Sequence, residues 1–249
     1  VPAVGTTTGG FAGNFAWGPV NEIITLSNET QLVDRFGKPD ANTYQHFFTA
    51  SNFLAYGSNL KVVRSANNTA KNATSSGTGI SVLNRSDYEQ NHSDGTGSDR
   101  FVAKYPGALG NSLKVAIADA NTYVGWTYAS SFSDSPGTSD WATAKASAND
   151  EVHIVVVDTT GLISGTANTI LEKYDFVSKA SDAKKLDGSS NYYKDVVNNL
   201  SKYVWWTAHP ASMTDWGTPA TTTNTYTQLA SAGSFTLTGG VNGNPTVGD

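Results

Sequence analysis

The sequence predicts an α+β fold, with a mixed β-sheet or two-layer sandwich flanked by a few helices and interrupted by polar β-hairpin insertions. Short apolar runs rich in β-branched residues indicate strands, and segments with apolar residues three and four positions apart indicate helices. The elements lack the regular strand–helix alternation of a doubly wound sheet. Aromatic residues make up 11% of the chain, and disordered chains lack such groups, so we expect a folded protein.

Three strands are expected in the first part of the chain. Residues 7–19 mix small and aromatic side chains and predict a strand that ends at a Gly18–Pro19 turn. Residues 22–26 predict a short apolar strand, and residues 60–64 predict the third. With the helices between them, these strands form a compact unit with clear turn signals.

Two helices are expected between the second and third strands. Asn28 is a candidate N-cap with Gln31 at the spacing of a capping box, and Gly37 is a candidate C-cap. The second helix is expected over about 42–56, and Gly57 closes it. We expect one of its faces to be aromatic and buried, formed by Tyr44, Phe47, Phe48, Ser51 and Leu54.

The rest of the chain alternates between polar excursions and ordered elements. Residues 67–98 are rich in Asn, Ser, Thr and Gly, and contain one weak strand signal at 80–83. A second polar excursion covers about 120–149, and the end of the chain from residue 239 to 245 is expected to be loose. Further strands are expected at 113–117, 152–158, 170–177, 203–206 and 235–238, with a helix at 192–200.

The composition argues against several classes of function. The net charge is -5 and the basic residues are scattered, whereas nucleic-acid binding needs clustered Lys and Arg. There is no cysteine, which excludes disulfides, thiolate metal sites and cysteine nucleophiles. No apolar run approaches the roughly 20 residues of a membrane helix. We therefore expect no nucleic-acid partner and no membrane insertion.

No catalytic, cofactor-binding or metal-binding residue is predicted. The histidines are His46, His92, His153 and His209, and no two of them have metal-binding spacing. His153 lies in an apolar run, so we expect its role to be structural. A hydrolase could use carboxylates such as Glu172, but spacing alone does not identify a catalytic pair such as Glu172 with Asp175.

A carbohydrate-binding or adhesin module is the main alternative function from the residues alone. The second polar excursion contains Trp126, Tyr128 and Trp141, which could offer a stacking surface for sugars. The commoner arrangement for such residues is a small hydrophobic cluster under a long loop. Mutation-sensitive glycan binding at Trp126 or Trp141 would favour the module.

Several segments, in order along the chain, resemble the tail sheath proteins of contractile-tailed bacteriophages. The segments are FAWGPVN (15–21), NETQLVDRFGKP (28–39), FFTASNFLAYGSNLKVVR (47–64), KYPGALGNSLKV (104–115), EKYDFVS (172–178) and FTLTGG (235–240). The motif residues, for which we expect structural roles, are Trp17, Gly18, Pro19, Phe36, Gly37, Pro39, Phe53, Leu54, Tyr56, Gly57, Arg64, Tyr105, Pro106, Gly107, Gly110, Asn111, Tyr174, Gly239 and Gly240.

The resemblance implies a non-enzymatic subunit that forms stacked hexameric rings around the tail tube and contracts to drive the tube through the host envelope. It implies no cofactor. The expected partners are other sheath subunits, with the tube and baseplate contacted through a C-terminal domain that we expect to be absent here. The expected location is the virion, and the host cytoplasm during assembly.

The resemblance also implies a domain organisation. Residues 1–66 and 103–249 are expected to form a discontinuous outer sheath domain, with 67–102 as a short inserted hairpin or small lobe. The chain does not begin with Met, and we expect a trimmed or processed chain that lacks the family's N-terminal linking arm. Without the arm and the tube-facing domain, this chain is expected to be monomeric.

Overall fold

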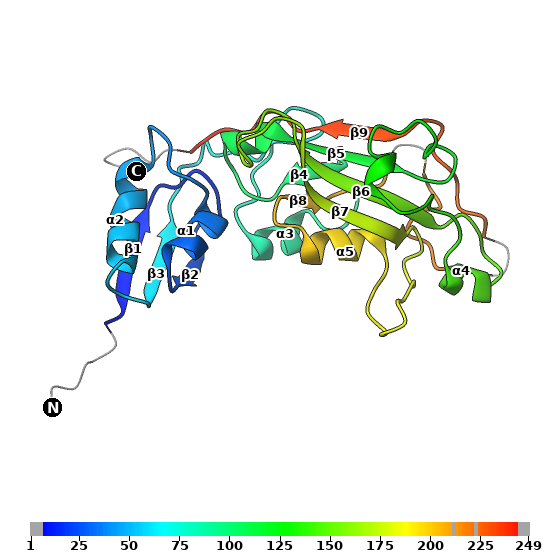
Figure 1. The fold of residues 1–249 in the computed structure, drawn as a ribbon, viewed down its shortest axis with the longest axis horizontal. Coiled ribbons are helices and arrows are strands. Elements are labelled where there is room, and N and C mark those ends of the chain that lie inside the picture. The colour runs from blue at the N-terminus through cyan, green and yellow to red at the C-terminus, as the bar shows by residue number, and fades with distance from the viewer. Residues whose placement is uncertain (1–6, 211–212, 222–223, 244–249) are drawn as a thin grey trace.

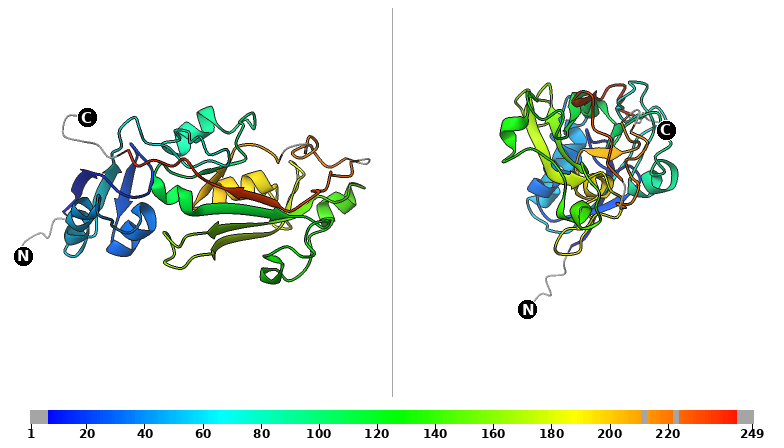
Figure 2. Two further views of the ribbon diagram at one scale, coloured as in Figure 1. Left: turned by 90° about the horizontal axis from the view of Figure 1, so that it is seen from above. Right: turned by 90° about the vertical axis from the view of Figure 1, so that its right-hand side faces the viewer.

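The computed structural model describes residues 7–210, 213–221 and 224–243, and it confirms the predicted α+β class. The molecule is elongated and has two lobes (Figures 1 and 2). We call residues 9–64 the N-terminal lobe and residues 65–243 the main lobe. The N-terminal lobe lies at one end of the long axis, beside the main lobe.

The N-terminal lobe contains a three-stranded mixed sheet and two helices. The strands are β1 (Gly9–Gly13), β2 (Ile23–Leu26) and β3 (Leu60–Arg64), and the helices are α1 (Glu29–Phe36) and α2 (Tyr44–Leu54). β3 is central, parallel to β1 and antiparallel to β2. The first strand is shorter than predicted, because residues after 13 leave the sheet and continue as bends.

The predicted caps of α1 are confirmed. The Asn28 side chain accepts a hydrogen bond from the backbone N–H of Gln31 at 2.9 Å. Gly37 has φ 78°, and its N–H donates to the carbonyl of Val33 at 2.9 Å. The core of this lobe is formed by Phe15, Leu26, Leu32, Phe36, Phe47, Ala50, Leu54, Leu60 and Val62.

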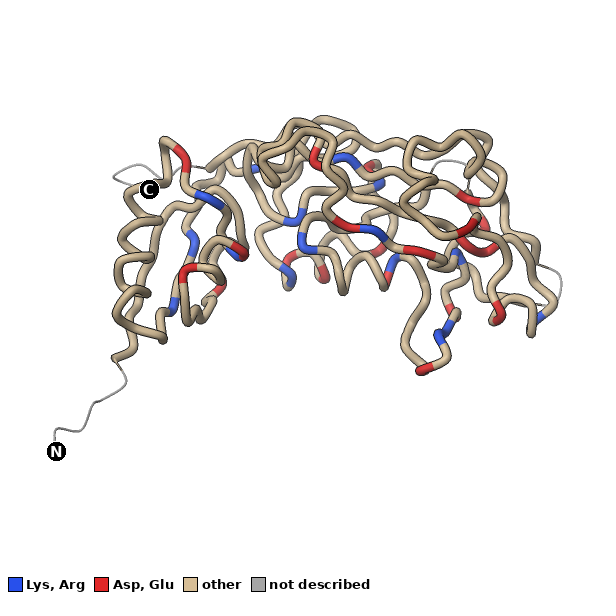
Figure 3. Tube along the Cα trace, viewed as in Figure 1, with Lys and Arg blue, Asp and Glu red and all other residues tan. Residues whose placement is uncertain are grey.

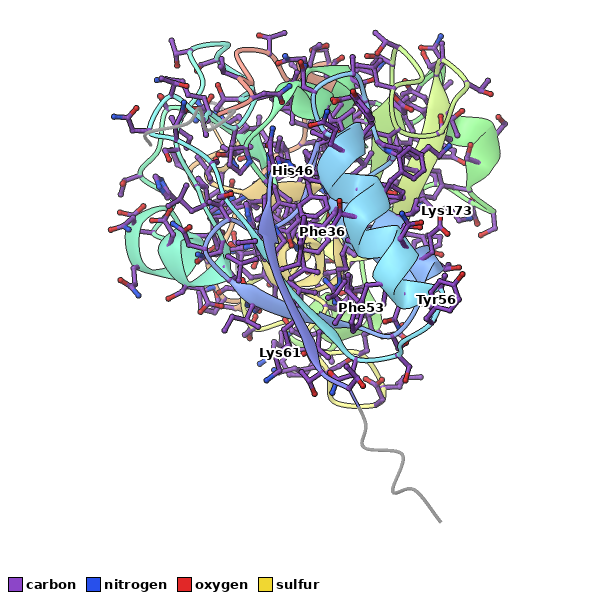
Figure 4. The ribbon with its side chains drawn as sticks, turned by 90° about the vertical axis from the view of Figure 1, so that its left-hand side faces the viewer. Phe36, His46, Phe53, Tyr56, Lys61 and Lys173 are labelled. Carbon is purple, nitrogen blue, oxygen red and sulfur yellow. The ribbon has the colours of Figure 1, made fainter. Side chains whose placement is uncertain are left out.

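The predicted buried face of α2 is partly wrong. Phe47 is 3% exposed, but Tyr44 and Phe48 are 47% and 51% exposed. Successive helical residues are rotated by about 100°, so a stripe centred on Phe47 and Leu54 leaves Tyr44 and Phe48 beside it. Phe36 lies inside the lobe, whereas Tyr56 projects from the end of α2 at 97% exposure (Figure 4).

The main lobe is organised around a four-stranded antiparallel sheet. Its strands are β5 (Leu113–Ala118), β6 (Glu151–Asp158), β7 (Thr169–Ser178) and β9 (Gly233–Thr236), in the order β7-β6-β5-β9. The strand expected at 152–158 is β6, which is buried along almost its whole length. β6 pairs antiparallel with β7, the strand that follows it.

A second, two-stranded sheet and α5 pack close to this sheet. β4 (Phe101–Ala103) pairs antiparallel with β8 (Val204–Trp206), and α5 (Tyr193–Leu200) contacts both β7 and β8. Short 3₁₀ helices at Ala108–Ser112 and Ala129–Ser131 complete the connections.

The polar stretch 67–98 is structured differently from the prediction. The expected strand at 80–83 is reduced to one isolated bridge between Ile80 and Asn72. Helix α3 (Arg85–Asn91), which the sequence analysis did not predict, follows it and packs Tyr88 against the indole of Trp205. The wider division of the chain into 1–66 plus 103–249 with an inserted 67–102 stays a prediction.

The second polar excursion contains a hydrophobic cluster, which the sequence analysis considered a commoner arrangement than a stacking surface for sugars. Trp126 is 8% exposed and stacks on Phe132, with ring centroids 5.6 Å apart. Trp141 lies in α4 (Asp140–Ala144) and is partly buried. The first of these indoles is therefore covered by its own loop rather than presented to solvent.

The Gly-rich C-terminal stretch is not loose where the structure describes it. Val241 forms an antiparallel bridge with Lys71, and the backbone of Thr238 pairs with Thr74. Residues 244 and 245, which were also expected to be loose, lie outside the described residues.

Candidate functional site

Arg64 joins the two lobes at the end of β3. Its side chain is 1% exposed, and Nη1 donates to the carbonyl of Gly18 at 2.7 Å. Nη2 donates to the carbonyl of Pro106 in the main lobe at 2.8 Å. Burial lowers the pKa of Arg64 to about 10, so the guanidinium keeps its charge at neutral pH. Nε has no hydrogen-bond partner among the described residues.

We call the contact region around Arg64, Gly18 and Pro106 the junction between the two lobes. Trp17 and Gly18 form its N-terminal side. The indole of Trp17 meets Tyr105 edge-on, with ring centroids 5.4 Å apart. The backbone N–H of Trp17 donates to the backbone carbonyl of Phe36 at 3.0 Å. Gly18 has φ 101°, and a Cβ there would lie 2.7 Å from the carbonyl oxygen of Arg35. This turn therefore requires glycine, both for its conformation and for its close packing.

Asn111 ties the C-terminal stretch to the same junction. Its Nδ2 donates to the carbonyl of Gly240 at 2.9 Å, and its Oδ1 accepts from the Gly240 N–H at 2.7 Å. A Cβ on Gly240 would lie 2.5 Å from the carbonyl oxygen of Gly107. Segments distant in sequence thus meet without room for additional atoms.

The structure brings together many of the sequence-predicted motif residues. Those at or next to the junction are Trp17, Gly18, Pro19, Arg64, Tyr105, Pro106, Gly107, Gly110, Asn111, Gly239 and Gly240. Phe36 and Gly37 adjoin the junction through Gly18 and Trp17. The remaining motif residues of the N-terminal lobe are Pro39, Phe53, Leu54, Tyr56 and Gly57. Tyr174 lies on β7 and donates to Glu172 at 2.8 Å.

An apolar groove, which we call the interlobe groove, opens beside this junction and has a volume of about 450 Å³. Its apolar wall is formed by Trp17, Val33, Pro39, Leu109, Leu162, Ile163 and Tyr203. Leu162 is 58% exposed. Charged groups also line the groove, where Lys202 pairs with Asp34 at 2.8 Å, and Lys38 and Asp40 lie nearby.

A more polar cleft of about 340 Å³ shares Trp17, Asp34 and Lys202 with the groove. Lys104 lines it and is 8% exposed, with Nζ 3.9 Å from the ring centroid of Trp205. Nζ donates to the carbonyl of Ser201, the C-cap of α5. Desolvation lowers the pKa of Lys104 to about 8. The amine is therefore a structural cap for the helix end.

The carboxylates considered for hydrolysis do not share a site. The Glu172 carboxylate accepts hydrogen bonds from Tyr174, from the Ser201 hydroxyl and from the Lys202 N–H. Asp175 is exposed on the same strand and lines a different, shallow pocket. Glu172 thus fixes the end of α5 against β7.

His153 has the structural role expected from the sequence. Its Nδ1 accepts the N–H of Phe176 at 3.1 Å, Nε2 lies 2.9 Å from the Asp134 carbonyl, and its ring stacks on Phe132. In the part of the chain that the structure describes, no group of three His, Cys, Asp or Glu side chains could hold a metal. Within the same residues, no helix has the length and apolar character needed to cross a membrane.

Several residues of the junction escaped the sequence analysis. Asn242 accepts from the Ala108 N–H at 2.8 Å, but it lies in a stretch without periodicity. No role was predicted for Leu162. The exposed pair Asp34–Lys202 joins segments 168 positions apart, a separation for which one sequence offers no signal.

Comparisons with known proteins give a consistent result. Residues 6–64 match the family model described as the N-terminal region of domain III of the tail sheath protein Gp18. The chain is 30% identical over 164 residues to the tail sheath protein of Salmonella phage ViI, which covers 65% of this chain and 24% of that protein. It is 47% identical over 70 residues to the tail sheath protein of Enterobacteria phage T4, covering 28% and 11% respectively.

A solved structure, the sheath tail protein Lin1278 from Listeria innocua, aligns over 96% of this chain and 35% of its own length, with a TM-score of 0.45 and 14% identity. This likeness is too weak to carry an argument. The chain spans about a quarter of the length of the Salmonella phage relative. The matched residues 6–64 include the whole N-terminal lobe, and up to 65% of the chain is similar in sequence to tail sheath proteins of myoviruses.

Proposed function

We propose that this chain is part of a structural subunit of a contractile phage tail sheath. In this proposal the complete subunit forms hexameric rings that stack around the tail tube. Contraction of the rings drives the tube through the host envelope, without turnover of a substrate. The protein would reside in the virion, after assembly in the host cytoplasm.

The match of residues 6–64 to a tail sheath domain is the observation that carries the proposal. A buried arginine and close glycine contacts hold the segments of the junction together, which suits a part that transmits force in a sheath. The Glu172 carboxylate and the His153 ring are occupied by structural hydrogen bonds. Two relatives of 30% and 47% identity over the matched segments are named tail sheath proteins, which supports the proposal.

We further propose that the tube and baseplate are contacted through parts of the protein other than this chain. This chain alone is then expected to sediment as a monomer at micromolar concentration. Rings or tubes formed by the chain alone would contradict that part of the proposal.

Electron microscopy of the complete gene product that contains this chain tests the main proposal. We expect long tubes of uniform width, with an axial repeat from stacked rings. A complete product that stays dispersed under conditions in which a related phage sheath polymerises would overturn the proposal. The related sheath in the same buffer is the positive control.

A further inference from the structure

An ordered hairpin projects from the main lobe between β7 and α5 (Figure 1). Lys184 pairs with Ser190 across it, and the Lys185 N–H donates to the Ser189 carbonyl at 2.9 Å. Asp187 accepts the Ser189 N–H at 2.9 Å and closes the turn. Leu186, at the tip, is 103% exposed.

The Leu186 side chain is fully exposed, so it is not part of a hydrophobic core in the described part of the chain. An exposed leucine side chain contributes favourable free energy when a partner surface removes it from water. Its backbone is already ordered by the turn, so binding through it would cost little additional conformational entropy. These two properties are those of a preorganised apolar anchor.

The interlobe groove offers the matching concave surface. Its apolar wall includes Val33, Leu109, Leu162 and Ile163, so it can take an aliphatic side chain. The groove adjoins the N-terminal lobe, whereas the hairpin hangs from the far part of the main lobe (Figure 1). A hairpin therefore cannot enter the groove of its own chain.

We propose that the Leu186 hairpin of one copy docks in the interlobe groove of a second copy of this chain. The inference rests on the proposed function, because a sheath subunit must contact other copies of itself. It adds the surfaces that form one such contact.

Charge favours a second copy as the occupant. The hairpin carries both signs, on Lys184, Lys185 and Asp187 (Figure 3). The groove also carries both signs, and Asp40 accepts hydrogen bonds from neutral donors only. A basic hairpin residue can thus face Asp40 while Asp187 faces a basic residue of the groove.

The contact would be heterologous, because it uses two different surfaces of the same chain. Contacts of this kind repeat from copy to copy, and they produce a ring when the rotation closes. One leucine and a short hairpin form a small interface, which is typical of weak contacts. The contact is therefore compatible with a monomeric chain at micromolar concentration.

Cysteine cross-linking tests the contact cleanly, because the chain contains no cysteine. Ser189→Cys keeps Leu186 in place, and it is mixed with Leu162→Cys at high protein concentration with a short bismaleimide. We expect a cross-linked dimer that needs both variants, formed about tenfold faster than in a mixture of Leu162→Cys with Val124→Cys. Val124 is 91% exposed and lies outside the hairpin, so it controls for random collision.

Equal rates for the Ser189→Cys and Val124→Cys mixtures would overturn the inference. Lys185→Glu added to Ser189→Cys should lower the yield of cross-linked dimer, whereas the same change added to Val124→Cys should leave its yield unaltered. Circular dichroism of each variant checks folding.

The same positions separate this inference from the proposed function. If the complete product forms tubes and Leu186→Asp leaves tube formation unchanged, the docking contact is wrong and the sheath role stands. If the unaltered complete product forms no tubes, the sheath role itself fails. If the unaltered product forms tubes and Leu186→Asp prevents them, while Val124→Asp does not, both proposals are supported.

Discussion

Arg64 donates from Nη2 to the carbonyl oxygen of Pro106 at 2.8 Å, and this bond links the N-terminal lobe to the main lobe. Nη1 of the same guanidinium donates to the carbonyl oxygen of Gly18 at 2.7 Å. A planar donor with fixed geometry can satisfy two carbonyls at once, which a lysine amine on a flexible stem does less well. The junction therefore depends on this side chain's shape as well as on its charge.

We predict that Arg64→Ala lowers the free energy of unfolding by about 3 kcal/mol, because two buried carbonyls lose a charged donor. Arg64→Lys should lower the free energy of unfolding by about half as much. Arg85→Ala is the control. Arg85 is exposed and pairs with Glu89 at 2.7 Å, so its loss should cost about 0–1 kcal/mol. Urea unfolding measures the three values, and equal losses for Arg64→Ala and Arg85→Ala would contradict the role assigned to Arg64.

Neighbouring phenylalanines of α2 provide a matched pair for the core. Phe47→Ala should lower the free energy of unfolding by about 3–5 kcal/mol, because its ring is 3% exposed among the lobe's apolar residues. Phe48→Ala, at 51% exposure, should change it by less than about 1 kcal/mol. Thermal and urea melts of the two variants make the comparison. Similar losses at both positions would show that the buried face of α2 has been assigned wrongly.

Helix α2 also shows how far sequence patterns reach. Periodicity located the helix, and the residues after it predicted its end, because both signals are local. The side chains that face the sheet depend on how the helix is rotated about its axis, and tertiary contacts set that rotation. Tyr44 and Phe48 were therefore misplaced, although their helix was predicted.

The junction shows a second limit. The resemblance to tail sheath proteins identified Arg64 and Gly240 as motif residues without saying what either contacts. Their roles arise from segments far apart in sequence, such as Arg64 with Pro106, 42 positions on. Helix α3 was missed for a different reason: Tyr88 is its one apolar residue, so the helix shows no apolar periodicity.

His209 should make the protein less stable in mild acid. Its Nδ1 lies 2.6 Å from the Tyr193 hydroxyl, and burial, with smaller effects of Lys194 and Arg100, lowers the pKa of His209 to about 4. An unfolded histidine has a pKa of about 6.5, so between these values the unfolded chain binds a proton that the folded protein refuses. Stability is therefore unaffected above about pH 6.5 and falls as the pH decreases toward 4.

The measurement is the melting temperature between pH 7 and 4, compared with His209→Gln. Each unit of pKa difference between the folded and unfolded states corresponds to about 1.4 kcal/mol of stability. The melting temperature of the parent protein should therefore fall more steeply with decreasing pH than that of His209→Gln. Burial also lowers the pKa of His153, which leaves the variant with a smaller slope of the same sign. Identical slopes for the parent and His209→Gln would rule out His209 as a source of the acid sensitivity.

Gly240 tests whether the C-terminal stretch is a fixed part of the junction. A Cβ there would lie 2.5 Å from the carbonyl oxygen of Gly107 and 3.0 Å from Oδ1 of Asn111. The first atom belongs to the backbone and cannot rotate away, so Gly240→Ala should cost about 1–3 kcal/mol. Gly10→Ala is the control, because a Cβ on Gly10 meets nothing within 4 Å. We expect Gly240→Ala, but not Gly10→Ala, to lower the melting temperature and to speed hydrogen exchange of the backbone amide at position 240. Equal effects of the two changes on both measurements would show that the stretch is not held as the structure indicates.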